Sequence, residues 1–160
     1  MGDKIKSKMI AEKASVNVVP GFIGEINNVN HANEISKKIG FPVIVKASAG
    51  GGGKGMRIVN SEEDVEEAFL RASSEAKNSF GDERLFVEKY LVEPRHIEIQ
   101  IIADNYGNVV SLGERECSIQ RRNQKVIEEA PSSFLDETLR RDMSTQAIML
   151  AKEVEYSSAG

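Results

Sequence analysis

Apolar and polar residues follow two different periods along the chain, and together these periods predict a mixed fold of helices and strands. Apolar side chains three or four residues apart indicate helices, because such positions share one helix face. The predicted helices span residues 4–14, 31–39, 62–77 and 137–154. Short apolar or alternating runs indicate strands. The predicted strands span residues 16–19, 43–47, 56–59, 85–89, 96–103 and 109–112, and residues 114–126 are expected to be extended.

Polar side chains at the predicted helix starts support these assignments. An N-cap side chain accepts a hydrogen bond from a backbone N–H of the first helical turn. The expected N-caps are Asp3, Asn30, Asp136, and Ser61 with Asp64 in a capping-box arrangement. In the first helix we expect Ile5, Met9 and Ile10 on the buried side.

The order of the elements changes near Tyr90. Before it, strands and helices are mixed, which indicates a compact α+β lobe. After it, the pattern predicts mostly antiparallel strands and one helix, with a turn at residues 105–108. We therefore expect a boundary between two lobes near Tyr90.

Composition and charge exclude several classes of protein. A net charge of −4 gives no global basic surface for nucleic acid. The longest apolar runs, such as Pro42–Val45, are far too short to cross a membrane, and the first residues do not resemble a secretory signal. Cys117 is the single cysteine, so the chain has no internal disulfide, and with only two histidines it offers no zinc site. We expect partners other than nucleic acid or membrane, and a reducing compartment.

A glycine run at residues 50–55 is the strongest local signal of function. Glycine loses the most backbone freedom on folding, so such a run is usually kept for a close approach of the backbone, most often to phosphate. A strand follows the run rather than a helix, and Gly55 precedes Met56, so neither a dinucleotide fingerprint nor a Walker A loop is present. A flap over a triphosphate fits better. A flexible hairpin without a ligand remains the alternative.

Lys46 lies inside an apolar strand, just before the glycine run. A buried lysine is costly unless its charge is paired, and phosphate is a good partner. The alternative is a side chain that extends to the edge of the sheet and reaches water.

Three stretches of the chain resemble signature segments of biotin carboxylases. Residues 41–55 are similar to an ATP-binding signature that this family shares with carbamoyl-phosphate synthetases. Residues 88–100 and 114–131 resemble biotin carboxylases in particular. The resemblance runs from Met1 to Gly160, and within the family it points to the propionyl-CoA carboxylase α branch.

The resemblance implies a partial ATP-grasp fold of the α+β class, with a lid lobe and the beginning of an antiparallel catalytic lobe. It assigns residues 1–17 to a helical linker, 18–90 to the lid lobe and 91–160 to the first part of the catalytic lobe. Family members use MgATP and bicarbonate to carboxylate biotin on a carrier domain. We therefore expect part of an ATP-dependent ligase, with ATP, Mg²⁺ or Mn²⁺, bicarbonate, a biotin carrier domain and a carboxyltransferase subunit as ligands and partners.

The resemblance also implies roles for individual residues. The phosphate contacts would be Lys4 and Lys46, and the flap glycines Gly52 and Gly53. The residues that hold adenine would be Met56, Glu88, Lys89, Tyr90 and Leu91. The contacts to ribose and its surroundings would be His96, Gln120 and Asn123. Lys125 would be the catalytic cation beside the transferring phosphoryl group.

Position 123 departs from the pattern of bacterial acetyl-CoA carboxylases, which typically carry histidine there. Asn123 can hydrogen-bond to a hydroxyl but does not titrate. This difference favours the propionyl-CoA branch.

The acidic metal ligands of the family, and its arginines for bicarbonate and biotin, follow the position that matches Gly160. The resemblance therefore implies no metal ligand within the chain, and we expect the chain alone to be catalytically inactive. It implies the bacterial cytoplasm or the mitochondrial matrix as the compartment.

Several alternatives remain open. The chain could be a nucleotide-binding or folding module without activity, or part of an acetyl-CoA, pyruvate or methylcrotonyl-CoA carboxylase. Another ATP-grasp ligase, such as a carbamoyl-phosphate synthetase, fits residues 88–100 less well. By spacing alone, His96 could be an ordinary strand histidine and Glu88 an ordinary surface charge.

Overall fold

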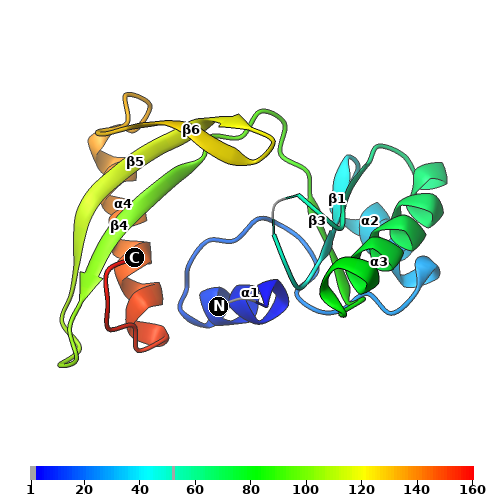
Figure 1. Ribbon diagram of the computed structural model, residues 1–160, viewed down its shortest axis with the longest axis horizontal. Helices are drawn as coiled ribbons and strands as arrows, with labels where there is room; N and C mark the ends of the chain where they lie inside the picture. Colours follow the sequence, from blue (N-terminus) through cyan, green and yellow to red (C-terminus); the bar gives the residue numbers. More distant parts are fainter. Residues whose placement is uncertain (1–2, 52) are drawn as a thin grey trace. The chain divides into compact units, whose positions relative to one another are not determined.

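The computed structural model describes residues 3–51 and 53–160 and divides them into two compact units (Figure 1). The first unit contains the residues up to Met9 together with Val18–Val92. The second contains Ile10–Asn17 and Glu93–Gly160. Helix α1 (Lys4–Lys13) contributes residues to both.

The first unit is a three-stranded antiparallel sheet with helices packed on it. Its strands are β1 (Val43–Ala47), β2 (Met56–Val59) and β3 (Leu85–Lys89), in the order β2-β1-β3. Helices α2 (Val29–Ile39) and α3 (Val65–Phe80) pack against these strands, and a short 3₁₀ turn, η1 (Glu62–Asp64), precedes α3.

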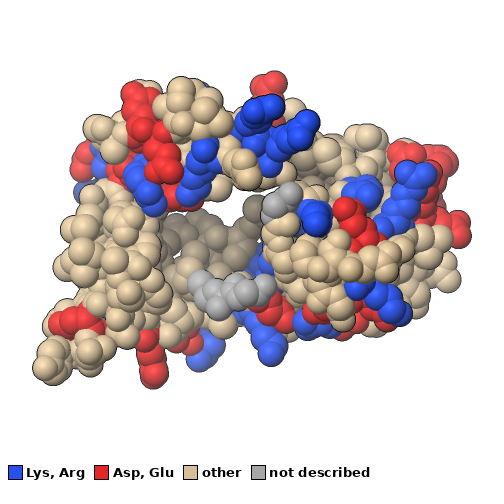
Figure 2. Space-filling view, viewed as in Figure 1, with Lys and Arg blue, Asp and Glu red and all other residues tan. Residues whose placement is uncertain are grey.

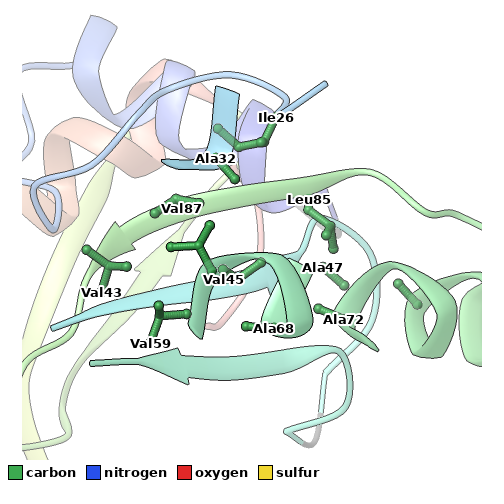
Figure 3. Packing of buried hydrophobic residues seen from close by; sticks show 12 residues of the cluster. Ile26, Ala32, Val43, Val45, Ala47, Val59, Ala68, Ala72, Leu85 and Val87 are labelled. Carbon is green, nitrogen blue, oxygen red and sulfur yellow. The ribbon is translucent and has the colours of Figure 1, made fainter. Parts of the chain in front are cut away.

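The core of this unit lies between the sheet and the two helices. Alternate residues of β1 are fully buried, namely Val43, Val45 and Ala47, as expected for a strand with one face on a core. Figure 3 shows them pointing toward side chains from β2, β3 and α3. Alanines at 68, 72 and 76 form a stripe at helical spacing that brings α3 close to the sheet. Burying each valine stabilises the fold by about 1.5–3 kcal/mol before entropy is counted.

The first residues of α1 are fastened to this same unit. The Lys4 backbone N–H donates to the Ser48 carbonyl at 3.0 Å, and Lys8 Nζ donates to the Val19 carbonyl at 3.0 Å. Asp3 caps the helix, because its Oδ1 accepts from the Lys6 N–H at 3.0 Å. Hydrogen bonds with Lys6, Ser48 and Arg84 hold the pKa of Asp3 at about 2, so the cap is ionised at neutral pH.

The second unit is an antiparallel sheet with one long helix. Its strands are β4 (Ile97–Ala103), β5 (Val109–Arg121) and β6 (Gln124–Glu129), in that order, and α4 (Glu137–Glu153) packs on β4 and β5. Asp136 caps α4 by accepting from the Leu139 N–H at 2.8 Å.

Most predicted elements are confirmed, and four details were wrong. Residues 16–19 form no strand: the Val16 N–H bonds to the end of α1 and the Asn17 N–H to a side chain of α4. Helix α2 begins earlier, with Asn28 rather than Asn30 as N-cap. The 3₁₀ turn prevents the capping box, and Ser61 Oγ bonds to the Asp64 side chain instead. Met9 is exposed.

The extended conformation predicted for residues 114–126 is confirmed, and a turn divides this segment between two antiparallel strands. Strand β5 extends through Arg121, and a two-residue turn leads into β6. Arg122 and Asn123 both have positive φ, of 52° and 62°. Two positive φ values in a two-residue loop match the twist of antiparallel strands, and asparagine tolerates this conformation better than most residues.

Candidate functional site

Three of the predicted site residues in the first unit, Lys46, Met56 and Glu88, lie on the sheet face opposite α2 and α3. Residues directly opposite each other in antiparallel strands point to the same side. Lys46 of β1 pairs with Met56 and with Phe86, and Ile44 pairs with Glu88. Lys46, Met56 and Glu88 therefore share one face, while the buried valines occupy the other.

Glu88 is the centre of an ion-pair cluster on this face. Its Oε1 contacts Lys46 Nζ, and its Oε2 lies 2.7 Å from Lys8 Nζ. The Glu88 side chain is only 7% exposed. Burial by itself would raise the pKa of Glu88, but the two lysines outweigh burial and hold that pKa below its usual value. Glu88 is therefore a buried carboxylate with a cation on each oxygen.

Lys4 brings an ammonium group to the start of the glycine loop. Its Nζ donates to the carbonyls of Ala47 and Ala49, each at 3.4 Å, and to that of Gly50. Burial lowers the pKa of Lys4, and the nearby charge of Lys46 lowers it further. Two mutually repelling cations at one place favour binding of an anion, because an anion relieves the repulsion.

The glycines of the loop differ in whether packing within the protein would exclude a side chain. At Gly50 a Cβ atom would lie 2.2 Å from the Phe80 ring, and at Gly55 it would lie 2.8 Å from the Ala47 Cβ; both have positive φ. These two glycines serve close packing within the protein. A Cβ at Gly51 would meet nothing within 4 Å, so packing within the protein does not require glycine there. Gly53 has a φ of 82°, and Gly52 lies outside the described residues.

The end of β3 carries the residues expected to hold adenine. Lys89 Nζ donates to the carbonyls of Gly40 and Phe41, at 2.9 and 3.0 Å, so this side chain fixes the loop before β1. The Tyr90 N–H donates to the Pro42 carbonyl at 3.2 Å, and Leu91 is exposed. The Lys89 N–H also donates to the Pro20 carbonyl, at 2.7 Å. With the Lys89 side chain and the N–H groups of Lys89 and Tyr90 engaged within the protein, this segment offers a ligand its remaining backbone groups and the Leu91 side chain.

The second unit carries a separate cluster of charges centred on Glu98. Its Oε1 contacts Lys125 Nζ and lies 2.9 Å from His96 Nε2, and its Oε2 lies 3.1 Å from Arg115. The hydrogen bond from Lys125 lowers the pKa of Glu98, and Glu98 in turn raises the pKa of Lys125. Arg115 also forms an ion pair with Glu128, with its Nη1 2.9 Å from Glu128 Oε2. Figure 2 shows acidic and basic side chains interleaved over β5 and β6.

The structure thus groups three of the predicted residues, His96, Lys125 and, nearby on β5, Gln120. Gln120 pairs with Lys125 across β5 and β6, and its Nε2 donates to the Cys117 carbonyl at 2.9 Å. Asn123 lies exposed in the tight turn between these strands, where it also has a conformational role.

Four further members of these clusters were missed from the sequence, namely Lys8, Glu98, Arg115 and Glu128. Lys8 stands one helical turn after Lys4, so the spacing on α1 was a usable signal. Glu98 stands two residues after His96 on the same strand face, which strand alternation also predicts.

A hollow in the second unit is not part of either cluster. It has a volume of about 480 Å³. Its lining comes from the β4–β5 turn with the start of β5, and from the end of α4 with the residues after it: Asp104, Asn105, Gly107, Val109, Ala151, Lys152, Glu155, Tyr156 and Ser157. None of the predicted site residues lines it. Among residues 3–51 and 53–160, no three His, Cys, Asp or Glu side chains are grouped to hold a metal ion, and no helix is long and apolar enough to cross a membrane.

Two neighbouring cationic side chains, one of which reaches the start of a glycine loop, are typical of a nucleotide-binding domain. The chain belongs to the family described as carbamoyl-phosphate synthase L chain, ATP binding domain, whose profile matches residues 3–160. It is 60% identical over its whole length to the propionyl-CoA carboxylase alpha chain of Ruegeria pomeroyi, and 59% identical to the mitochondrial counterpart of Sus scrofa. It spans 24% and 22% of these two relatives, about a quarter of their length.

Solved structures agree on the fold. The chain matches a biotin carboxylase of Campylobacter jejuni, described as a β,γ-ATP complex, with a TM-score of 0.96 and 49% identity over 99% of this chain and 36% of that one. It matches the biotin carboxylase domain of the 2-oxoglutarate carboxylase of Hydrogenobacter thermophilus, in complex with MgADP, ADP and bicarbonate, with a TM-score of 0.94 and 48% identity over 99% and 35%. The fold is therefore the α+β ATP-grasp fold of the biotin carboxylase ATP-binding domain.

Proposed function

We propose that this chain is the MgATP-binding part of a biotin carboxylase that serves a propionyl-CoA carboxylase. One observation carries the proposal: the charges of Lys4 and Lys46 lie close enough to repel each other, and Lys4 reaches the glycine loop at the Gly50 carbonyl, next to Gly51, where a Cβ would meet open space. Relatives with similar sequence carry the propionyl-CoA carboxylase name, and similar structures hold ATP or ADP.

In this proposal each group on the first unit has a physical task. The ammonium groups of Lys4 and Lys46 neutralise phosphate oxygens, and the backbone N–H groups around Gly51 and Gly53 approach them closely. Met56 packs on the base, while the backbone of residues 88–91 supplies its hydrogen bonds. Because Lys89 is engaged within the protein, its side chain shapes this segment and leaves recognition to the backbone.

The second unit supplies the remaining groups. His96, Gln120 and Asn123 hydrogen-bond to ribose or neighbouring atoms. Lys125 stabilises the charge that develops on the transferring phosphoryl group. Glu98 keeps Lys125 protonated, because their ion pair raises the pKa of Lys125. Under this proposal the first unit is the lid lobe and the second begins the catalytic lobe.

The metal ion belongs to the parent enzyme in this proposal. Mg²⁺ prefers carboxylate and phosphate oxygens, and the described residues do not group carboxylates in a way that would hold it. Bicarbonate, biotin on a carrier domain and a carboxyltransferase subunit are proposed for the parent enzyme. Its compartment would be the bacterial cytoplasm or the mitochondrial matrix.

Calorimetric titration with MgATP tests this function. We expect the chain to bind MgATP, and Lys46→Ala to weaken binding about 10- to 100-fold, because a charge-assisted hydrogen bond to phosphate contributes about 1.5–3 kcal/mol. The matched control is Lys38→Ala, an exposed lysine on α2, which should bind as the unaltered chain does. Absence of binding by an unaltered chain that circular dichroism shows to be folded would overturn the proposal.

A further inference from the structure

The two lysines on Glu88 occupy different oxygens, so they can act independently. Lys46 contacts Oε1 and Lys8 contacts Oε2. Each can leave without disturbing the hydrogen bond of the other. A carboxylate held in this way keeps one partner when it loses the other.

The two lysines are not equally free to move. Lys8 Nζ also donates to the Val19 carbonyl at 3.0 Å and lies 5.7 Å from the centre of the Phe86 ring. Its side chain is 12% exposed. Lys46 is 24% exposed, and within the part of the chain that the structure describes, Glu88 is its single side-chain hydrogen-bond partner. Lys8 is therefore the anchored cation and Lys46 the movable one.

A nucleotide phosphate must compete with Glu88 for Lys46. Both are anions, and an ammonium group that turns toward phosphate turns away from a carboxylate that is 7% exposed. Leaving a buried carboxylate without a partner is costly. That cost would oppose phosphate binding unless a second cation stays behind.

We propose that Lys8 is a positioning residue of the nucleotide site: it stays on Glu88 and thereby frees Lys46 to bind phosphate. The inference rests on the proposed nucleotide-binding function and adds a residue to it. Lys8 does not touch the nucleotide in this scheme. It acts by keeping Glu88 ionised and in place at the end of β3 while Lys46 changes partner.

A stability measurement tests the counter-ion role without any ligand. Lys8→Met and Lys46→Met should each lower the melting temperature modestly, because Glu88 keeps one cation. The double variant should lose more than the sum of the two, and adding Glu88→Gln should recover part of that loss. Additive losses with no recovery would show that the lysines do not share Glu88, and would overturn the inference.

A calorimetric cycle with MgATP tests the effect on binding. Lys8→Met should weaken binding about tenfold in the unaltered chain, and Lys8→Arg should largely restore it. In a chain that already carries Glu88→Gln, Lys8→Met should have no further effect, because a neutral amide needs no cation. An equal loss in both backgrounds, or no loss in either, would overturn the inference.

Failure of the proposed function and failure of the Lys8 inference give different experimental results. If the folded, unaltered chain does not bind MgATP, the proposed function fails, and the nucleotide role of Lys8 fails with it. If the unaltered chain binds and only the Lys8 cycle gives the contrary result, the proposed function stands and Lys8 is a structural residue alone.

Discussion

Replacing Gly50 with alanine should lower the free energy of unfolding of the first unit by about 3 kcal/mol. The added Cβ would lie 2.2 Å from the Phe80 ring, far inside contact distance, and Gly50 has a φ of +79°. Overpacking costs about 1–3 kcal/mol, and a left-handed conformation costs a residue with a side chain about 1–2 kcal/mol more. Urea unfolding followed by circular dichroism measures the loss.

Gly51→Ala is the matched control, one residue along the same loop. Its Cβ would enter open space, so unfolding should change by less than about 0.5 kcal/mol. Under the proposed function it should weaken MgATP binding, because a side chain would stand where the backbone approaches phosphate. If both variants were equally stable, the packing of Gly50 on Phe80 would not be the reason for the glycine.

Replacing Glu114 with glutamine should lower the free energy of unfolding of the second unit by about 3 kcal/mol. The Glu114 side chain is 1% exposed and accepts from Arg140 Nε at 2.9 Å and from the Ser132 N–H at 3.1 Å. The pair joins β5 to α4. Breaking a buried ion pair by removing one partner typically costs about 3–5 kcal/mol, and the partial exposure of Arg140 places the expected loss at the lower end.

Glu137→Gln is the control for this prediction. Glu137 also contacts Arg140, at 2.9 Å, but its side chain is 83% exposed, so its loss should barely change stability. Urea unfolding at neutral pH compares the two variants. A loss at Glu137 as large as that at Glu114 would show that burial does not decide the strength of these pairs.

The contribution of Glu114 to the free energy of unfolding should decrease as pH falls. Burial alone would raise the pKa of Glu114, but Arg140 and the Ser132 N–H lower it below its ordinary value of 4.5. A lowered pKa contributes stability that is present above the unfolded value and is lost as pH falls through the folded value. The difference between Glu114→Gln and the unaltered chain should therefore be full at pH 7 and shrink below about pH 4.

Local sequence patterns predicted most of the fold because most of its elements have one buried face. Strand β1 alternates so clearly that its core residues could be read directly from the sequence. The start of α2 could not be read from the sequence in this way, because Asn27, Asn28 and Asn30 are all acceptable N-caps. The apolar periodicity does not choose among them. Residues 16–19 alternate like a strand but have no neighbouring strand to pair with, and one chain segment alone does not show that.

The candidate site was predictable where its signal is local in the sequence and not where it depends on contacts between distant segments. The glycine run and Lys46 stand together in the sequence and were found. Lys8 and Glu88 are 80 positions apart, and their contact arises from the way α1 lies on the sheet. Within the glycine run, composition could not separate Gly50, which packs on a ring, from Gly51, which is open.

In strand β1, residues that pack in the core alternate with residues on the face of the candidate site. Val43, Val45 and Ala47 face the core, whereas Ile44 and Lys46 face the opposite side. Selection for a stable fold and selection for ligand chemistry therefore act on neighbouring codons without competing for the same one. Core valines can drift among side chains of similar volume while the charge pattern persists, and the charge at position 46 can change without unpacking the core. Such a strand lets a lineage alter what it binds while keeping the fold that binds it.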